Sequence, residues 1–505
     1  MSAIEDLVRR TEARRQQVSA QLDFNRRSEL GQFFTPSPAA QLIADMVGPI
    51  KENAIRLLDP GAGVGSLTTA FLARLVRLQW HGHVDITAVE IDPDVLPHLN
   101  QTLQECSKIL PQYGINLSIK VINGDFIKLG TISDHTGPLS EYFDFVIMNP
   151  PYKKLGAKAN ERLALAARGV SCSNLYSSFL ALATMLLRPG GRLVAITPRS
   201  FANGPYFGDF RRFLLSNVTL DRIHVFESRS KVFADAEVLQ ENIIFSATRF
   251  GSTDNVTLST SEGYEDTPIS RNVPYSEIVK DNDPHQFIHL PTSERDTKIA
   301  EAIANLPCTL AELGLKVSTG KVVDFRARSY LKSQPAEGAV PLIYPGNLRK
   351  GRVNWPLQIR KPQAILDVPQ TQKLLLPGER FVLVNRFTAK EERRRVVAAV
   401  YEPDDIDAAR VGFENHLNVF HSNERGIEHS VAYGLCAWLN SSIVDQFFRI
   451  FSGHTQVNAT DLRSLRYPSL AQLSELGGAL GMGIWPEQEK IDALVATHVL
   501  EGEIC

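Results

Sequence analysis

The feature that most restricts the fold of this sequence is the alternation of short apolar runs with longer helical stretches between Ile55 and Phe250. The runs IRLLD, VDITAVEI, LSIKVI, FDFVIM and GRLVAITP have the length and apolar content of buried strands. Such alternation predicts the α/β class, with a mostly parallel sheet and helices on both of its faces. The last two runs, RIHVF and ENIIFSATRF, follow one another without a helix, and they predict an antiparallel hairpin at one edge of the sheet.

At 505 residues the chain is long enough for more than one domain, and its sequence divides into four segments. Residues 1–30 predict a charged helix followed by a linker, and residues 31–250 predict the α/β domain. Residues 251–305 are polar and predict a connecting region. In residues 306–505, Gly, Pro and Asn interrupt short strands and helices, which indicates a second domain of mixed α+β structure.

Composition excludes several classes of protein. No run of about 18 apolar residues is present, so we expect no membrane span. The N-terminal sequence MSAIEDLVRRTEARRQQ lacks the apolar core of a secretion signal, so we expect a cytoplasmic protein. The five cysteines form no CxxC pair and the histidines lack metal-ligand spacing, so we expect neither a structural disulfide nor a metal site.

A net charge of −2 conceals a strongly basic block. Between Lys316 and Arg395 the chain carries 17 Lys and Arg residues against 6 Asp and Glu, an excess of 11 positive charges. A solvated surface is the ordinary explanation of charged residues. An excess concentrated in this way favours a polyanion as partner.

Three predicted strands end in residues that are able to bind a ligand. The first is followed by DPGAGVGS, in which Gly61, Gly63 and Gly65 allow a sharp turn and a close approach of the backbone to a ligand. The second ends at Glu90, which can accept hydrogen bonds from ribose hydroxyls. The third ends at Asp125, which can accept one from an exocyclic amine.

Each of these residues alone is also typical of a helix cap or a turn. Because the carboxyl ends of parallel strands meet at one edge of a sheet, the three together predict a site for an adenosine. Beside them stand three further candidates for the same ligand: Asp59, Ile91 and Phe126.

The fourth predicted strand ends abruptly in FDFVIMNPPYKKL, Phe143 to Leu155. Proline cannot donate to a sheet ladder, so the strand stops at the two prolines. Asn149, Pro150, Pro151 and Tyr152 therefore predict a rigid platform at a strand's carboxyl end, where open α/β sheets bind their ligands.

These motifs together resemble the S-adenosylmethionine-dependent methyltransferases, which have a Rossmann-like sheet. With NPPY at the fourth strand, the chain is similar to the gamma-class, TaqI-like DNA adenine-N6 methyltransferases, and GQFFTPSPAAQLIADMV matches the segment that precedes their glycine loop. The resemblance covers about residues 30–250. It implies S-adenosylmethionine as cofactor, double-stranded DNA as substrate, a target-recognition domain in residues 306–505, and the modification role of a type II restriction–modification system.

The resemblance also implies roles for single residues. Asn149 and the Pro150 carbonyl would bind the amino group of an adenine flipped out of the duplex, and Tyr152 would stack on that base. Phe233 would stack on its far side, although a core aromatic is an equal reading of that residue. The segment Phe34, Thr35 and Pro36 would close over the methionine part of the cofactor. The predicted cofactor set is Phe34, Thr35, Pro36, Asp59, Gly61, Gly63, Gly65, Glu90, Ile91, Asp125, Phe126 and Asn149.

The basic block interleaves Arg and Lys with aromatic residues, a composition that suits contacts to phosphates and bases. The candidates for DNA binding are Lys153, Lys154, Arg326, Arg328, Arg349, Lys350, Arg352 and Trp355. For each one, a surface charge or a small-domain core aromatic is the alternative. The segments VSTGKVVDF and NHLNVF resemble the BsuBI/PstI-type branch, which implies CTGCAG as the target.

The family further implies a bacterial enzyme that acts at the nucleoid. It also implies a restriction endonuclease that shares the target site without stable binding. Two alternatives stay open from the residues. A protein glutamine methyltransferase also uses Asn-Pro-Pro-Tyr, but such enzymes are shorter and lack a basic C-terminal half. A DNA-specificity module without catalysis is the other. A dehydrogenase is disfavoured because the loop reads GxGxG instead of GxGxxG.

Overall fold

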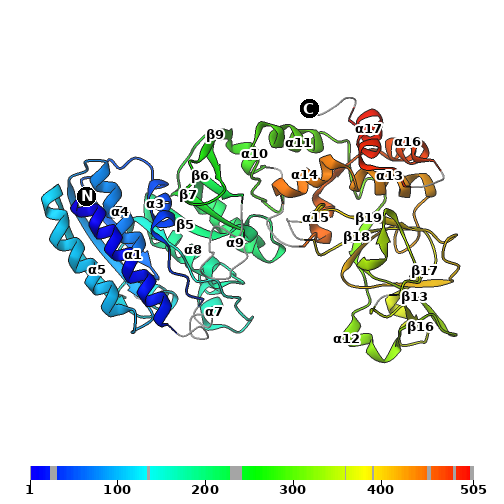
Figure 1. Ribbon diagram of the computed structural model, residues 1–505, viewed down its shortest axis with the longest axis horizontal. Helices are drawn as coiled ribbons and strands as arrows, with labels where there is room; N and C mark the ends of the chain where they lie inside the picture. The colour runs from blue at the N-terminus through cyan, green and yellow to red at the C-terminus, as the bar shows by residue number, and fades with distance from the viewer. Residues whose placement is uncertain are drawn as a thin grey trace. The chain divides into compact units, whose positions relative to one another are not determined.

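The computed structural model describes residues 2–22, 31–132, 137–227, 241–281, 283–358, 360–388, 392–451, 456–481 and 485–500. The chain forms two compact units, Met1–Thr292 and Ser293–Cys505 (Figure 1). Within the described ranges, no helix is both long and apolar enough to cross a membrane.

The first unit is built on a nine-stranded sheet with the order β3-β2-β1-β4-β5-β7-β6-β8-β9. Strands β1 to β5 are parallel, so β1 to β4 end at the same edge, and the strand order reverses between β1 and β4. Open α/β sheets bind ligands at such a point. The strands are β1 Ala54–Pro60, β2 Gly82–Glu90, β3 Ile115–Asn123, β4 Phe143–Met148, β5 Leu187–Pro198, β6 Val218–Phe226, β7 Asn242–Arg249, β8 Asn255–Ser261 and β9 Ile269–Pro274.

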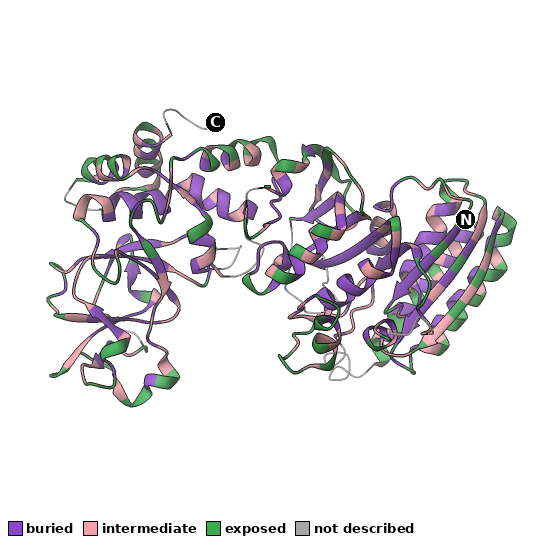
Figure 2. Ribbon diagram, turned by 180° about the vertical axis from the view of Figure 1, so that it is seen from behind, coloured by how far each residue is buried: buried purple, intermediate pink, exposed green. Residues whose placement is uncertain are grey.

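Helices cover both faces of this sheet, which explains why its central strands are apolar along most of their length (Figure 2). Successive strand residues serve different cores: Leu57 and Ile147 join one apolar cluster, and Leu58 and Met148 join the other. The first face carries α1 Ala3–Gln21, α3 Ser37–Asp45, α4 Ser66–Arg77 and α5 Leu96–Ile109. The second carries α6 Phe126–Gly130, α7 Asn160–Ala166, α8 Leu175–Leu186, α9 Gly208–Asn217 and α10 Tyr275–Ile278.

The sheet is wider than the sequence predicts. Strands β6 and β7 form the expected antiparallel pair, but this pair is internal, because β8 adds parallel to β6 and β9 follows β8. Val256 and Leu258 on β8 are buried, while β9 is mostly exposed and forms the edge. The segment 251–305, expected to be a connection, therefore extends the first unit and then begins the second. The sequence VTLSTS is rich in polar residues and was therefore assigned to a connection, but it forms most of the half-buried strand β8.

The N-terminal charged helix, α1, packs on the first unit instead of standing apart. Arg14 is buried and donates to Thr102 Oγ1 and to Glu105 Oε1, both at 2.6 Å, on α5. Glu12 accepts the Ser37 backbone N–H at 2.9 Å, at the start of α3. The charges of this helix therefore attach it to its own unit.

The second unit contains a six-stranded sheet, β11-β21-β18-β19-β15-β14, a five-stranded sheet, β12-β16-β13-β20-β17, and the pair β10-β22. Its strands are β10 Cys308–Thr309, β11 Lys316–Thr319, β12 Leu331–Lys332, β13 Ala339–Ile343, β14 Leu348–Arg349, β15 Gly351–Val353, β16 Ala364–Leu366, β17 Leu375–Pro377, β18 Phe381–Asn385, β19 Ala398–Tyr401, β20 Arg410–Phe413, β21 Leu417–His421 and β22 Arg466–Tyr467. Its helices are α11 Glu294–Ala304, α12 Asp324–Ala327, α13 His429–Leu439, α14 Ser442–Phe451, α15 Ala459–Ser464, α16 Leu470–Leu480 and α17 Gln488–His498.

Removing the Arg14 side chain tests the attachment of α1. We expect Arg14→Ala to lower the free energy of unfolding by about 1–3 kcal/mol, because the Thr102 hydroxyl loses its donor and Glu105 loses one of its two arginine partners, the other being Arg10. Arg9→Ala is the control: the Arg9 side chain is 70% exposed and pairs with Asp6 on its own helix, so we expect a change within about 0.5 kcal/mol. Urea denaturation of both variants measures the difference, and equal effects would contradict this role of Arg14.

Candidate functional site

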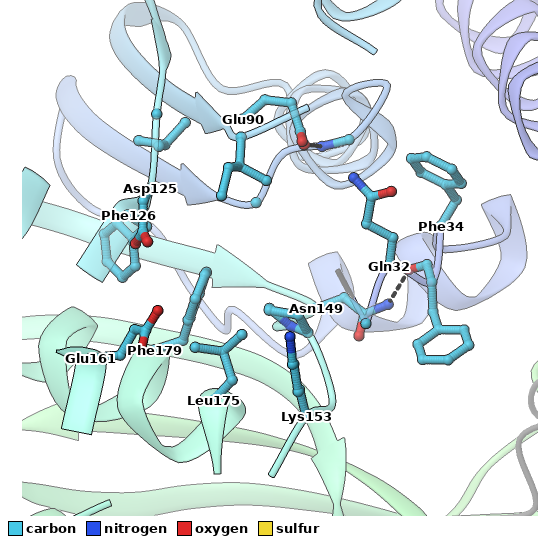
Figure 3. Close-up of a pocket in the computed structure, with 18 residues that line it drawn as sticks. Gln32, Phe34, Glu90, Asp125, Phe126, Asn149, Lys153, Glu161, Leu175 and Phe179 are labelled. Atoms are coloured by element: carbon cyan, nitrogen blue, oxygen red, sulfur yellow. Dashed lines mark hydrogen bonds between the residues drawn. The ribbon is translucent and has the colours of Figure 1, made fainter. Parts of the chain in front are cut away.

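A cavity lies at the edge of the sheet where β1 to β4 end (Figure 3). In the close-up, Asp125, Phe126 and Glu161 lie toward one end of the cavity, while Gln32, Phe34 and Asn149 lie toward the other. Its lining residues are Gly31, Gln32, Phe33, Phe34, Gly61, Gly63, Val89, Glu90, Ile91, Gly124, Asp125, Phe126, Asn149, Pro151, Lys153, Glu161, Leu175 and Phe179.

The glycine turn after β1 forms one wall of the cavity. Gly63 has a φ of 56°, and a Cβ at this position would lie 3.0 Å from the Phe34 ring. Gly65 has a φ of 87° and is the N-cap of α4, which has no side-chain cap bond. The backbone N–H groups at the start of α4 therefore donate no hydrogen bond to an N-cap side chain.

Glu90, at the end of β2, connects this turn to the next strand. Its carboxylate oxygens accept the backbone N–H of Gly63 and that of Asp92, both at 2.8 Å. Burial raises the pKa of Glu90, and the nearby Asp92 charge adds to this effect. Each carboxylate oxygen retains a second lone pair, so Glu90 is able to bind a hydroxyl group in the cavity as well.

Asp59, at the end of β1, is fully buried and accepts a hydrogen bond of 2.6 Å from Thr68 Oγ1. Burial raises the pKa of this carboxyl to about 7, and the neighbouring charge of Glu90 contributes. Its second oxygen, Oδ1, is buried without a hydrogen-bond partner. Asp59, predicted to bind the cofactor, is not among the residues that line the cavity, and its contact with Thr68 instead joins the end of β1 to α4.

Asp125 serves both as a helix cap and as a wall of the cavity. Its Oδ1 accepts the backbone N–H groups of Ile127 and Lys128 at 2.9 and 3.2 Å, so Asp125 is the N-cap of α6. The predicted cap and the predicted ligand residue are therefore the same side chain. Phe126 is buried with its ring centre 5.0 Å from that of Phe179, and Ile91, 45% exposed, lines the same cavity. These three apolar side chains suit a flat heterocycle.

Asn149, which follows β4, has a fixed orientation. Its Nδ2 donates to the Phe33 carbonyl oxygen at 2.9 Å and to Thr35 Oγ1 at 3.1 Å. A carbonyl oxygen can only accept, so the nitrogen of this amide faces Phe33 and the oxygen faces the other way. That oxygen, Oδ1, is buried without a partner. The structure therefore presents a free acceptor at the end of β4.

The remaining platform residues differ in exposure. Pro150 is buried, and Pro151 lines the cavity. Tyr152 is half-buried: its hydroxyl lies 3.4 Å from the Ile196 carbonyl oxygen, and its ring is 5.9 Å from Phe33 between centres. Burial raises the Tyr152 pKa well above the usual range, so the phenol stays neutral. Lys153 and Lys154 are exposed, and Lys153 reaches the cavity.

The segment before α3 closes the cavity on the side of Asn149. Phe34 lines it, Thr35 is buried against Asn149, and Pro36 is the N-cap of α3 and does not line the cavity. Phe233, predicted to stack on a base, lies outside the described residues. Several lining residues were not singled out in the sequence, among them Gln32, Phe33, Glu161 and Leu175. Gln32 and Phe33 lie within the motif GQFFTP, whereas Glu161 adjoins no motif.

The predicted DNA-binding residues of the second unit fall into two groups. Arg326 and Arg328 are exposed on α12 and the turn that follows it. Arg349 and Lys350, at the β14–β15 turn, line a second cavity with three other arginines: Arg393, Arg394 and Arg449. Two of these arginines, Arg393 and Arg394, belong to the charged run EERRR at 391–395, from which the sequence could have suggested them as DNA-binding candidates.

The structure uses the other two predicted residues of this unit internally. Arg352 pairs with Asp405 at 3.2 Å and lies 5.7 Å from the Tyr433 ring centre. Trp355 packs against the apolar core of its unit and donates its indole N–H to the Gln363 carbonyl oxygen at 2.6 Å. These contacts favour structural roles for both side chains.

In the part of the chain that the structure describes, no group of three or more His, Cys, Asp or Glu side chains is arranged to hold a metal ion. The candidate site is instead a cavity with carboxylate, amide and aromatic walls.

Comparison with known proteins gives three kinds of match. The family model for the Eco57I restriction-modification methylase matches residues 90–233. Type II methyltransferase M.PstI of Providencia stuartii is 43% identical over 486 residues, which cover 95% of each chain. Type II methyltransferase M.BsuBI of Bacillus subtilis is 44% identical over 89% of this chain and 90% of its own. Among solved structures, the type IIL restriction-modification enzyme MmeI in complex with DNA matches with a TM-score of 0.56, 11% identity, and coverage of 88% of this chain and 69% of its own.

Adding one methyl group to the glycine turn tests the cavity. We expect Gly63→Ala to weaken binding of S-adenosylmethionine by at least 10-fold, because its Cβ would press on the Phe34 ring and the left-handed backbone disfavours alanine. Isothermal titration calorimetry measures the affinity.

Gly169→Ala is a matched control for this experiment. Gly169 also has a positive φ, 88°, but a Cβ there would meet nothing within 4 Å. It carries the same backbone strain without a cavity contact, so its affinity for the cofactor should stay within about 2-fold of the wild type. Similar losses in both variants would assign the effect to backbone strain instead of the cavity.

Proposed function

The chain belongs to the type II DNA methyltransferases of restriction–modification systems, and from this premise we propose that it methylates the N6 amino group of an adenine flipped out of the duplex. S-adenosylmethionine is its cofactor. The finer assignment, adenine N6, rests on the chemistry at the end of β4.

The observation that carries this proposal is the free oxygen of Asn149. An exocyclic amino group offers two hydrogens and needs acceptors for both. Asn149 Oδ1 is buried without a partner, while the amide nitrogen is held by Phe33 and Thr35. The neighbouring Pro150 carbonyl supplies the second acceptor in this proposal, because the proline ring restricts the direction of the backbone there.

These two acceptors would perform the chemical work of the chain. The lone pair of an adenine amino group is delocalised into the ring, so its nitrogen is a poor nucleophile. Acceptors that bind both hydrogens favour a tetrahedral nitrogen with a localised lone pair, and they do so without reorganisation if they are already in place. When bound, S-adenosylmethionine supplies an electrophilic methyl group on a sulfonium ion.

The cavity has the groups that such a cofactor needs. Glu90 lines the cavity and suits the ribose hydroxyls, while Asp59 lies buried behind the glycine turn and does not line the cavity. Asp125, with Phe126 and Ile91, would hold the adenine ring of the cofactor. The contact between Gly63 and Phe34 leaves no room for a side chain at the turn, as expected where the backbone itself approaches a ligand.

An adenine inside a duplex cannot reach a cavity of this kind, so the target base would be flipped out of the duplex. Tyr152 would then stack on the flipped base. Lys153, Lys154 and the exposed arginines of the second unit would contact phosphates. The resemblance of the segments at 317–325 and 415–420 to the BsuBI/PstI-type branch implies CTGCAG as the target in this proposal. We further propose that a restriction endonuclease of the same system reads this site without stable binding to the methyltransferase, and that methylation takes place on the nucleoid DNA of a bacterial cytoplasm.

Truncation of Asn149 tests the proposed chemistry. We expect Asn149→Ala to reduce the single-turnover rate of methyl transfer by about 100-fold or more, because one of the two pre-positioned acceptors is lost. Cofactor affinity should fall by less, at most about 10-fold, since the amide oxygen acts on the target base and only the bonds of the amide nitrogen to Phe33 and Thr35 support the cavity wall. Methyl transfer from labelled S-adenosylmethionine and calorimetric titration measure the two quantities. Near-normal turnover of Asn149→Ala would remove the basis of the proposal.

The target sequence is tested with duplexes that contain CTGCAG or a variant with one base pair changed. We expect incorporation of labelled methyl into the first duplex only, on adenine N6, and protection of that duplex against an endonuclease that cuts CTGCAG. Equal incorporation into both duplexes would contradict the target. Label in protein without label in DNA would instead favour a protein glutamine methyltransferase.

A further inference from the structure

Three exposed aromatic side chains occur among the described residues of the first unit: Tyr142, Tyr206 and Phe250, which are 57%, 78% and 58% exposed. Tyr142 directly precedes β4, and Phe250 follows β7, which runs antiparallel to β5. Both therefore lie at the edge of the sheet where the parallel strands begin. Tyr206 follows β5 and belongs to the edge where the candidate site lies. A single exposed aromatic residue is common on protein surfaces, so a functional role has to be argued from the residues around it.

The loop that carries Tyr206 is held from within by a buried arginine. Arg211, which is 1% exposed, donates to the carbonyl oxygens of Phe201 at 3.0 Å, Gly204 at 2.8 Å and His285 at 3.1 Å. A buried guanidinium is destabilising unless its N–H groups have acceptors. Here the N–H groups donate to backbone oxygens of the loop and of a neighbouring segment. The backbone two residues before Tyr206 is therefore fixed.

Tyr206 is also anchored from the other side by its neighbour in the chain. Phe207 is buried, and its ring centre lies 5.5 Å from that of Tyr176. The turn itself, Pro205–Phe207, is a single 3-10 turn. Because residues 204 and 207 are both fixed, the exposed tyrosine between them has little freedom in its backbone.

The segments that contact the Tyr206 loop also contact the Asn-Pro-Pro-Tyr platform. The Tyr206 carbonyl oxygen accepts from Ser173 Oγ at 3.1 Å. The segment that contains Ser173 pairs with the platform: Leu155 N–H donates to the Ser173 carbonyl oxygen at 2.9 Å, and Lys154 forms a bridge with Asn174. Tyr176 contacts Tyr152 with 6.1 Å between ring centres. Tyr206 and Tyr152 are thus carried by one set of packed segments.

A rigid loop that presents a tyrosine to solvent gains no stability from that ring, but it binds a partner without a further ordering cost. We propose that Tyr206 enters the duplex and stacks on the base pair beside the target, filling the gap left when the adenine is flipped out. This inference rests on the proposed function. Aromatic and apolar side chains that insert between base steps compensate for lost stacking in this way.

The experiment compares Tyr206→Ala on two duplexes of the same sequence, one with a paired target adenine and one in which an abasic site faces that adenine. On the paired duplex we expect a fall in the single-turnover methylation rate of about 10- to 100-fold, the loss of one base–aromatic stack. On the second duplex the adenine is already unpaired and costs less to flip, so the fall should be below about 3-fold. Tyr206→Phe, which retains the ring, should keep at least half of the wild-type rate on both.

Tyr142→Ala is the matched control, since it removes a similarly exposed tyrosine from the opposite edge and should leave both rates unchanged. Cofactor affinity and thermal midpoint of Tyr206→Ala should equal those of the wild type. An unchanged rate on the paired duplex, or an equal fall on both duplexes, overturns the inference for Tyr206. If the wild-type enzyme transfers no methyl group to adenine in either duplex, the proposed function fails, and that result is visible without any variant.

Discussion

The site depends on the hydrogen bonds that hold the amide nitrogen of Asn149. Phe33 and Thr35 accept from it, and this pair of contacts connects the end of β4 to the segment that precedes α3. The oxygen of the same amide is thereby turned away as a buried acceptor without a partner. Glu12 of α1 holds the next part of that segment through Ser37. A helix that looks like a charged extension in the sequence therefore supports the wall of the cavity.

Desolvation determines the character of the rest of the cavity. Asp59 and Glu90 are buried at the ends of adjacent strands, and burial raises the pKa of both. Glu90 lines the cavity, so this desolvated carboxyl group gains most from a ligand that brings positive charge and hydrogen-bond donors. A sulfonium ion with an amino group and ribose hydroxyls has these properties. Burial of Asp59 behind the glycine turn raises its pKa to about 7, because the charged carboxylate is poorly solvated there.

The fold of the second unit places its basic residues in separate groups. Arg326 and Arg328 stand on one short turn, and Arg349 and Lys350 border a cavity with arginines from two other parts of the chain. Charge density along the sequence predicted a polyanion partner but did not separate these groups. Trp355, an equally plausible base contact in the sequence, is used as a core residue because its indole N–H has a partner inside the unit.

The sequence alone predicted the parallel strands of the sheet and the ends of β1 to β4, because apolar periodicity, glycine and proline act locally. It did not determine the extra strands β8 and β9, whose polar alternation is also typical of loops, or the positions of Glu161 at the cavity and of the exposed Tyr206, which adjoin no motif. Only the tertiary structure decided which oxygen of which side chain stays free. Hydrogen-bond partners such as Phe33 and Asn149 are far apart in the chain, and a local pattern carries no record of their pairing.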